Sequence, residues 1–189
     1  MVPSPFKKKA TKAGPTVVVG VSGGIACYKT AELVRLLAKN NFNVHVVMTK
    51  AATEFVTPLT FQALSVNPVH TDIFDLTQES EMGHIELADN AKLVVIAPAT
   101  ANLLAKASHG ICDDLLTTLI CVTRAPILLA PSMNCHMWAN KIVQKNVREL
   151  KKNGFLFVGP DEGSLACGYE GMGRMAEPEE ILKSIQKII

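Results

Sequence analysis

"TVVVGVSGGIACYKT" (residues 16–30) joins an unbroken apolar run to a turn with glycines and then to a helix-like segment. Because the run is continuous rather than alternating, both of its faces are expected to be buried, as in a parallel sheet covered by helices on both sides. Leu33, Val34 and Leu37 follow at helical spacing. The stretch therefore predicts a buried strand, a tight turn and a helix.

Four more apolar runs of strand length follow, at residues 44–49, 93–98, 126–131 and 155–160. They alternate with segments of helical period, including residues 137–154, where Gly154 is the expected C-cap, and residues 177–189. This alternation predicts an α/β fold, a doubly wound parallel sheet with helices on both faces. The length suits one domain, residues 16–189, after a flexible basic leader at residues 1–15.

Composition narrows the classes of function. The net charge is only +2, and aromatic residues do not alternate with a basic face, so we expect no nucleic-acid partner. The apolar runs are too short to span a membrane. The five cysteines form no C-x-x-C pair and no signal peptide is recognisable, which favours a cytoplasmic protein. His109 with Cys112, and Cys135 with His136, do not complete a set of four ligands, so no metal is expected.

The first turn suits a phosphate group. Gly23 and Gly24 permit close approach of the backbone, Ser22 offers a hydroxyl, and the following helix presents N–H groups. An NAD site would need an acidic residue at the end of the second strand, where this chain has Thr49 and Lys50. This favours a mononucleotide, with a tight turn that binds no ligand as the alternative.

Two later turns reach the same edge of the predicted sheet. "PATAN" (98–102) follows the third strand and "PSMNCHMW" (131–138) follows the fourth. Their small side chains, with Asn102 and Asn134, could contact a flat ring system. Helix N-capping is the alternative role for both asparagines.

Two reactive side chains stand in short motifs. His84 begins an expected helix in "MGHIELAD" (82–89), where a lone histidine is more often a packing or capping residue than a catalyst. Cys167 lies in "LACGYEGMGRM" (165–175), which has the composition of a mobile loop. A small buried thiol would be the ordinary reading of this cysteine.

In this order, "GVSGGIACYK", "GHIELA", "PATAN", "PSMNCHMW" and "ACGYEGMGRM" resemble the motifs of the flavin-containing cysteine decarboxylases, in particular the phosphopantothenoylcysteine decarboxylases of coenzyme A biosynthesis. The resemblance covers about residues 16–182. It implies a Rossmann-like, flavodoxin-type fold, an FMN cofactor, and a homotrimer or dodecamer with active sites between subunits. It also implies a phosphopantothenate-cysteine ligase domain, fused or separate.

The resemblance implies that the thiol of 4′-phosphopantothenoylcysteine is oxidised to a thioaldehyde. Loss of CO₂ gives an ene-thiol, which is reduced to 4′-phosphopantetheine. His84 would be the base or charge stabiliser, and Cys167 the proton donor. The substrate would contact Asn134, Met137, Ala166 and Gly168. FMN would contact Ser22, Gly23, Gly24, Ile25, Thr49, Lys50, Thr100, Ala101, Asn102 and Ser132.

Two departures from the family pattern occur. Tyr169 stands where the pattern reads ACGD, and "PATANL" stands for "PASANT". The alternatives are a peptidyl-cysteine decarboxylase of lantibiotic-type peptide maturation, which generally lacks the cysteine, and a non-enzymatic halotolerance-type regulatory subunit, which tends to carry an acidic tail. A flavin prenyltransferase should lack "GHIELA" and "PSMNCHMW".

Overall fold

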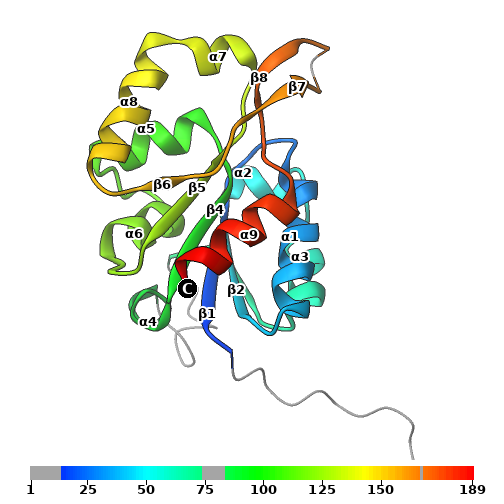
Figure 1. The fold of residues 1–189 in the computed structure, drawn as a ribbon. Helices are drawn as coiled ribbons and strands as arrows, with labels where there is room; N and C mark the ends of the chain where they lie inside the picture. The colour runs from blue at the N-terminus through cyan, green and yellow to red at the C-terminus, as the bar shows by residue number, and fades with distance from the viewer. Residues whose placement is uncertain (1–13, 74–83, 167) are drawn as a thin grey trace, which may run out of the picture.

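The computed structural model describes residues 14–73, 84–166 and 168–189. Its main sheet has six parallel strands in the order β3-β2-β1-β4-β5-β6 (Figure 1). This order is that of doubly wound Rossmann sheets, so the predicted fold class is confirmed. The strands are β1 (Thr16–Val21), β2 (Asn43–Met48), β3 (Val69–His70), β4 (Leu93–Ala99), β5 (Ile127–Pro131) and β6 (Leu156–Phe157).

Helices cover both faces of this sheet (Figure 1). The face with α1 (Cys27–Lys39), α3 (Pro58–Ser65) and α9 (Pro178–Ile188) holds one apolar cluster. The opposite face holds a second cluster with α4 (His84–Asn90), α5 (Ala101–His109), α6 (Leu115–Val122) and α8 (Lys141–Lys152). Two short helices, α2 (Lys50–Thr53) and α7 (Cys135–Ala139), follow β2 and β5.

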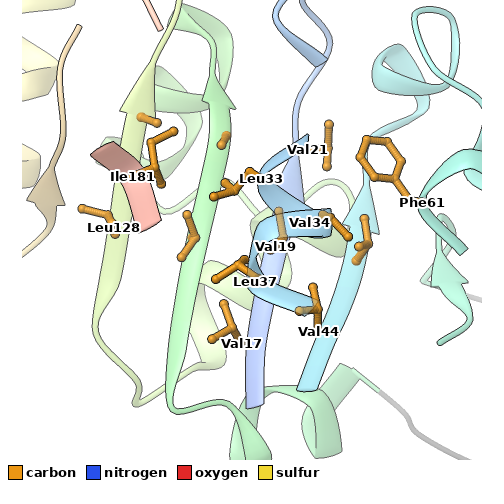
Figure 2. Packing of buried hydrophobic residues seen from close by; sticks show 14 of the residues in the cluster. Val17, Val19, Val21, Leu33, Val34, Leu37, Val44, Phe61, Leu128 and Ile181 are labelled. Atoms are coloured by element: carbon orange, nitrogen blue, oxygen red, sulfur yellow. The ribbon is translucent and has the colours of Figure 1, made fainter. Parts of the chain in front are cut away.

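The central strand β1 explains why the apolar runs are unbroken. Val17 and Val19 enter one cluster, whereas Val18 enters the other, and all three are fully buried. Figure 2 shows Leu33 and Leu37 of α1 packed with Val17 and Val19 on the first face. A strand with helices on both sides therefore needs apolar side chains at successive positions.

Two predicted elements are wrong in extent. The helix expected over residues 137–154 is broken at Asn140, which ends α7 and begins α8 with an extended ψ of 131°. Its side chain accepts a hydrogen bond from the backbone N–H of Ile142 at 2.8 Å, so it caps the second helix. The strand expected over residues 155–160 is confined to β6 at the sheet edge.

The stretch 165–175, expected to be a loop, contains a strand. β8 (Glu170–Arg174) pairs antiparallel with β7 (Asp161–Ser164) in a two-stranded hairpin that lies beside α7 (Figure 1). Glycine-rich, polar strands lack the alternation from which a strand is recognised in sequence.

The expected leader falls mainly on residues 1–13, which lie outside the described residues. Within the described part, the backbone N–H of Asn43 donates to the carbonyl of Pro15 at 3.1 Å. None of the helices in these ranges has the length and apolar character needed to cross a membrane.

The second face of the sheet carries a buried histidine. His45 is 7% exposed, its Nε2 accepts a hydrogen bond from the Asn43 amide at 3.2 Å, and its Nδ1 has no hydrogen-bond partner within the described residues. Its ring centroid lies 6.4 Å from that of His70. Burial, and then repulsion from His70, lowers the pKa of His45 below the ordinary value of 6.5.

Acid should therefore destabilise the fold through His45. Unfolded His45 binds a proton more readily, so stability is lost as pH falls from 6.5 toward the lower folded pKa and is unaffected above 6.5. We expect His45→Leu to reduce this loss, as measured by urea midpoints between pH 7.5 and about pH 5. His109→Leu, at an exposed position, is the control. The same acid loss in wild type and His45→Leu would contradict this prediction.

Candidate active site

A cavity of about 1160 Å³ opens at the carboxyl ends of β1, β4 and β5. The turn after β1 leads to α1 on one face, whereas the turn after β4 leads to α5 on the other. The strand order reverses between these two strands, and ligands of open α/β sheets bind at such a point. The end of the β7–β8 hairpin forms a further wall.

Ser22 joins the turns that follow β1 and β4. Its hydroxyl is buried, donates to the carbonyl of Pro98 at 2.7 Å and accepts from the backbone N–H of Thr100 at 3.1 Å. The two strands are adjacent, but the turns are 76 or more residues apart in sequence. One side chain therefore fixes the separation of two cavity walls.

The turn after β1 lies close to the backbone that follows β2. A Cβ at Gly23 would stand 2.5 Å from the Cβ of Ala51 and 2.8 Å from its carbonyl carbon, so only glycine fits. Ala26 is the N-cap of α1 and has no side-chain hydrogen bond to the first turn. The thiol of Cys27 donates to the carbonyl of Ser22 at 3.2 Å, and burial raises its pKa, so it is a structural thiol.

Helix capping occupies several polar side chains at the cavity. Thr49 caps α2 by accepting from the N–H of Ala52, and Thr100 caps α5 by accepting from the N–H of Leu103. Asn134 caps α7, where its Oδ1 accepts from the N–H of His136 at 2.8 Å. Asn134 therefore caps a helix, and it also borders the cavity. Asn102 is the second residue of α5, so Thr100 takes that cap instead.

Backbone contacts hold the hairpin beside the segment after β5. The N–H of Met133 donates to the carbonyl of Gly173 at 3.0 Å. A Cβ at Gly173 would lie 2.3 Å from the carbonyl oxygen of Met133, and one at Gly171 would lie 3.2 Å from the Cβ of Cys135. Glycines in β8 therefore permit the close approach that brings the hairpin over the cavity.

Sequence reasoning missed a charged cluster on the cavity wall. Lys29 donates to the carboxylate of Glu177 at 2.9 Å, and Arg174 pairs with the same carboxylate. The Lys29 hydrogen bond, followed by that of Arg174, lowers the pKa of Glu177. The cluster ties α1 to the end of β8. Lys29 and Arg174 stand in the quoted motifs, but no sequence spacing indicates that they meet at one glutamate.

Most of the residues expected at the site border this one cavity. They are Ser22, Gly23, Gly24, Ile25, Thr49, Lys50, Thr100, Ala101, Asn102, Ser132, Asn134, Met137 and Ala166.

Three residues expected at the site are not among these lining residues. Gly168 is not among the lining residues, and its N–H donates to the carbonyl of Leu165 at 2.9 Å. Cys167 lies outside the described residues. His84 is the first residue of α4, and its side chain is outside what the structure describes. Figure 1 places α4 near the amino ends of β1 and β4, at the edge of the sheet opposite the cavity.

Two pairs, His109 with Cys112 and Cys135 with His136, were considered as metal ligands in the sequence. Within residues 14–73, 84–166 and 168–189, His, Cys, Asp and Glu side chains do not gather in a group of three or more that could hold a metal ion.

Comparisons with known proteins agree with this geometry. A family model described as "Flavoprotein" matches residues 5–189. The coenzyme A biosynthesis bifunctional protein CoaBC of Haemophilus influenzae is 50% identical over 172 residues, covering 91% of this chain and 43% of that protein. The chain thus spans less than half the length of the curated relatives it matches.

Two solved structures share the fold over most of both chains. A PPC decarboxylase with a cysteine-to-serine mutation, complexed with pantothenoylaminoethenethiol, matches with a TM-score of 0.82 and 31% identity, covering 92% of this chain and 97% of that one. The FMN binding protein AtHal3 matches with a TM-score of 0.78 and 32% identity, covering 92% and 95%. With the family model matching nearly the whole chain, the protein belongs to the Flavoprotein family, and its cofactor is a flavin.

Proposed function

We propose that this chain is an FMN-dependent decarboxylase that converts 4′-phosphopantothenoylcysteine to 4′-phosphopantetheine in coenzyme A biosynthesis. The observation that carries the proposal is the convergence of separate segments, after β1, β2, β4 and β5 and from the hairpin, on one cavity. The names of the relatives, CoaBC and PPC decarboxylase, support this substrate. The match to bifunctional proteins also supports a phosphopantothenate-cysteine ligase, fused or separate, as the partner activity.

The cavity suits FMN among the flavins. Its volume of about 1160 Å³ exceeds the roughly 300–1,000 Å³ of common ligand pockets, which leaves room for cofactor and substrate together. Gly23 keeps the turn between β1 and α1 free of a bulky side chain, and the backbone N–H groups of this turn, ahead of α1, are suited to one phosphate. At the end of β2 stand Thr49 and Lys50 rather than an acid for a second ribose.

Direct loss of CO₂ from an acylated cysteine would leave a carbanion with no group to accept the electron pair. When bound, FMN supplies two-electron oxidation of the thiol and the later return of those electrons. Once the thiol is a thioaldehyde, the carboxylate lies β to a C=S bond, so the C–CO₂ electron pair moves toward sulfur. Asn134 and Met137 line the cavity and would hold the carboxylate and the thiol-bearing carbon in place.

We assign proton transfer to two residues. Cys167 would donate the proton that accompanies reduction of the ene-thiol, since its neighbour Ala166 lines the cavity. His84 would act as base or charge stabiliser, yet α4 lies at the opposite edge of its own sheet (Figure 1). We therefore propose that His84 completes the cavity of a neighbouring copy in a trimer-based assembly.

Cys167→Ser tests the function and the acid together. Wild type with FMN should release CO₂ from 4′-phosphopantothenoylcysteine and form 4′-phosphopantetheine. Serine is a far weaker acid, so Cys167→Ser should still release CO₂ but yield a product two hydrogens lighter, detected by mass spectrometry under anaerobic conditions. Cys112→Ser, an exposed thiol outside the cavity, is the control.

Absence of CO₂ release by wild type would contradict the proposed function. Ordinary turnover to the saturated product by Cys167→Ser would contradict only the role of the thiol. A peptide that ends in cysteine serves as a second substrate, because its faster turnover would favour the peptidyl-cysteine decarboxylase alternative.

Coexpression tests whether His84 and Cys167 act from different copies. His84→Asn alone should bind FMN but fail to turn over, and Cys167→Ser alone should stall. An equimolar mixture of both variants in one assembly should recover about a quarter of the wild-type rate of 4′-phosphopantetheine formation. With random mixing, about a quarter of the sites between copies combine an intact His84 from one chain with an intact Cys167 from another. A mixture no more active than the separate variants would place both groups in one chain's site.

A further inference from the structure

An aromatic contact joins the end of the hairpin to α7. The ring centroids of His136 and Tyr169 lie 5.3 Å apart, with an interplanar angle of 79°. This edge-to-face arrangement is a favourable geometry for aromatic pairs. Tyr169 is 52% exposed, so burial in the core does not account for its position.

Both residues connect through the backbone to cavity walls. The carbonyl of Tyr169 accepts a hydrogen bond from the N–H of Leu165 at 2.8 Å, and Leu165 and Ala166 line the cavity. On the other side, the N–H of His136 donates to Oδ1 of Asn134, which also lines the cavity. The ring contact therefore links two walls that belong to separate elements.

The base of the hairpin is fixed in another way. There Gly173 meets Met133 through a backbone hydrogen bond of 3.0 Å and a close approach that excludes a Cβ. Three residues before Gly173, at the start of β8, Glu170 is exposed, and Met172 is 44% exposed. The position of the hairpin's end therefore depends on contacts between exposed side chains. The edge-to-face contact of His136 with Tyr169 is one of them.

We propose that Tyr169 is a positioning residue which, through His136, holds the Leu165–Ala166 wall against Asn134 and thereby sets the affinity for the acylated cysteine substrate. The inference rests on the proposed function. Without the contact, the wall is correctly placed for a smaller fraction of the time, and apparent affinity falls by that fraction. Aromatic pairs of this kind correspond to a change of about two- to tenfold.

The test uses the holoenzyme and a double-mutant cycle. Tyr169→Leu and His136→Leu should each raise KM about two- to tenfold with kcat nearly unchanged. The KM of the double variant should be no higher than that of the single variant with the higher KM. Tyr169→Phe keeps the ring and should retain the wild-type KM. Phe55→Leu removes a similarly exposed ring outside the cavity lining and is the matched control.

Hydrogen–deuterium exchange gives a readout that does not depend on turnover. In the holoenzyme without substrate, the peptide spanning 162–175 should exchange faster in Tyr169→Leu and His136→Leu than in wild type, Tyr169→Phe or Phe55→Leu. Unchanged exchange, or faster exchange with an unchanged KM, would overturn the inference while wild-type turnover upholds the proposed function. Wild type that fails to decarboxylate the substrate overturns the function itself, and with it the inferred effect on KM.

Discussion

The buried hydroxyl of Ser22 holds together the two turns on which the cavity depends. It donates to Pro98 and accepts from Thr100, so the ends of β1 and β4 are fixed where their helices leave toward opposite faces. Loss of this hydroxyl would leave the buried carbonyl of Pro98 without this donor, at a cost of about 1–3 kcal/mol, and would also remove the acceptor of the partly buried N–H of Thr100. A parallel sheet supplies a crevice at this point, and Ser22 sets its width.

Glycine determines what can approach that crevice. At Gly23 the absence of a Cβ allows the turn to pack on Ala51, and at Gly173 it allows the hairpin to contact Met133. The first contact brings backbone N–H groups toward the phosphate side of the proposed flavin site. The second brings the hairpin, with the segment around Ala166, over the same cavity. Both contacts require backbone to meet backbone, which no larger residue permits.

The sequence predicted those parts whose physical cause is local. Unbroken apolar runs such as residues 16–21 identify strands buried on both faces, and the turn with Ser22 and Gly23 after the first strand lies at the cavity, as expected. The break at Asn140 was missed, because the helical period continues through this residue although asparagine is a favoured N-cap. The strand β8 was missed because its glycines obscure the pattern.

Contacts between distant segments could not be predicted from spacing. Lys29 donates a hydrogen bond to Glu177, which is 148 residues away in the sequence. The ring of His136 in α7 contacts the ring of Tyr169 at the end of the hairpin. The separation of α4 from the cavity of its own chain also required the fold (Figure 1). That separation is the reason for proposing that His84 acts in the cavity of a neighbouring copy, in keeping with the expected active sites between subunits.

In the proposed function, the turn after β1 receives the phosphate of a mononucleotide flavin. The most direct measurement is equilibrium titration of the flavin-free protein with FMN and with riboflavin, which differ by that phosphate. Several charge-assisted hydrogen bonds from backbone N–H groups predict that FMN binds at least about tenfold more tightly than riboflavin. Equal affinities for the two flavins would show that the turn does not hold the phosphate and would contradict the proposed cofactor site.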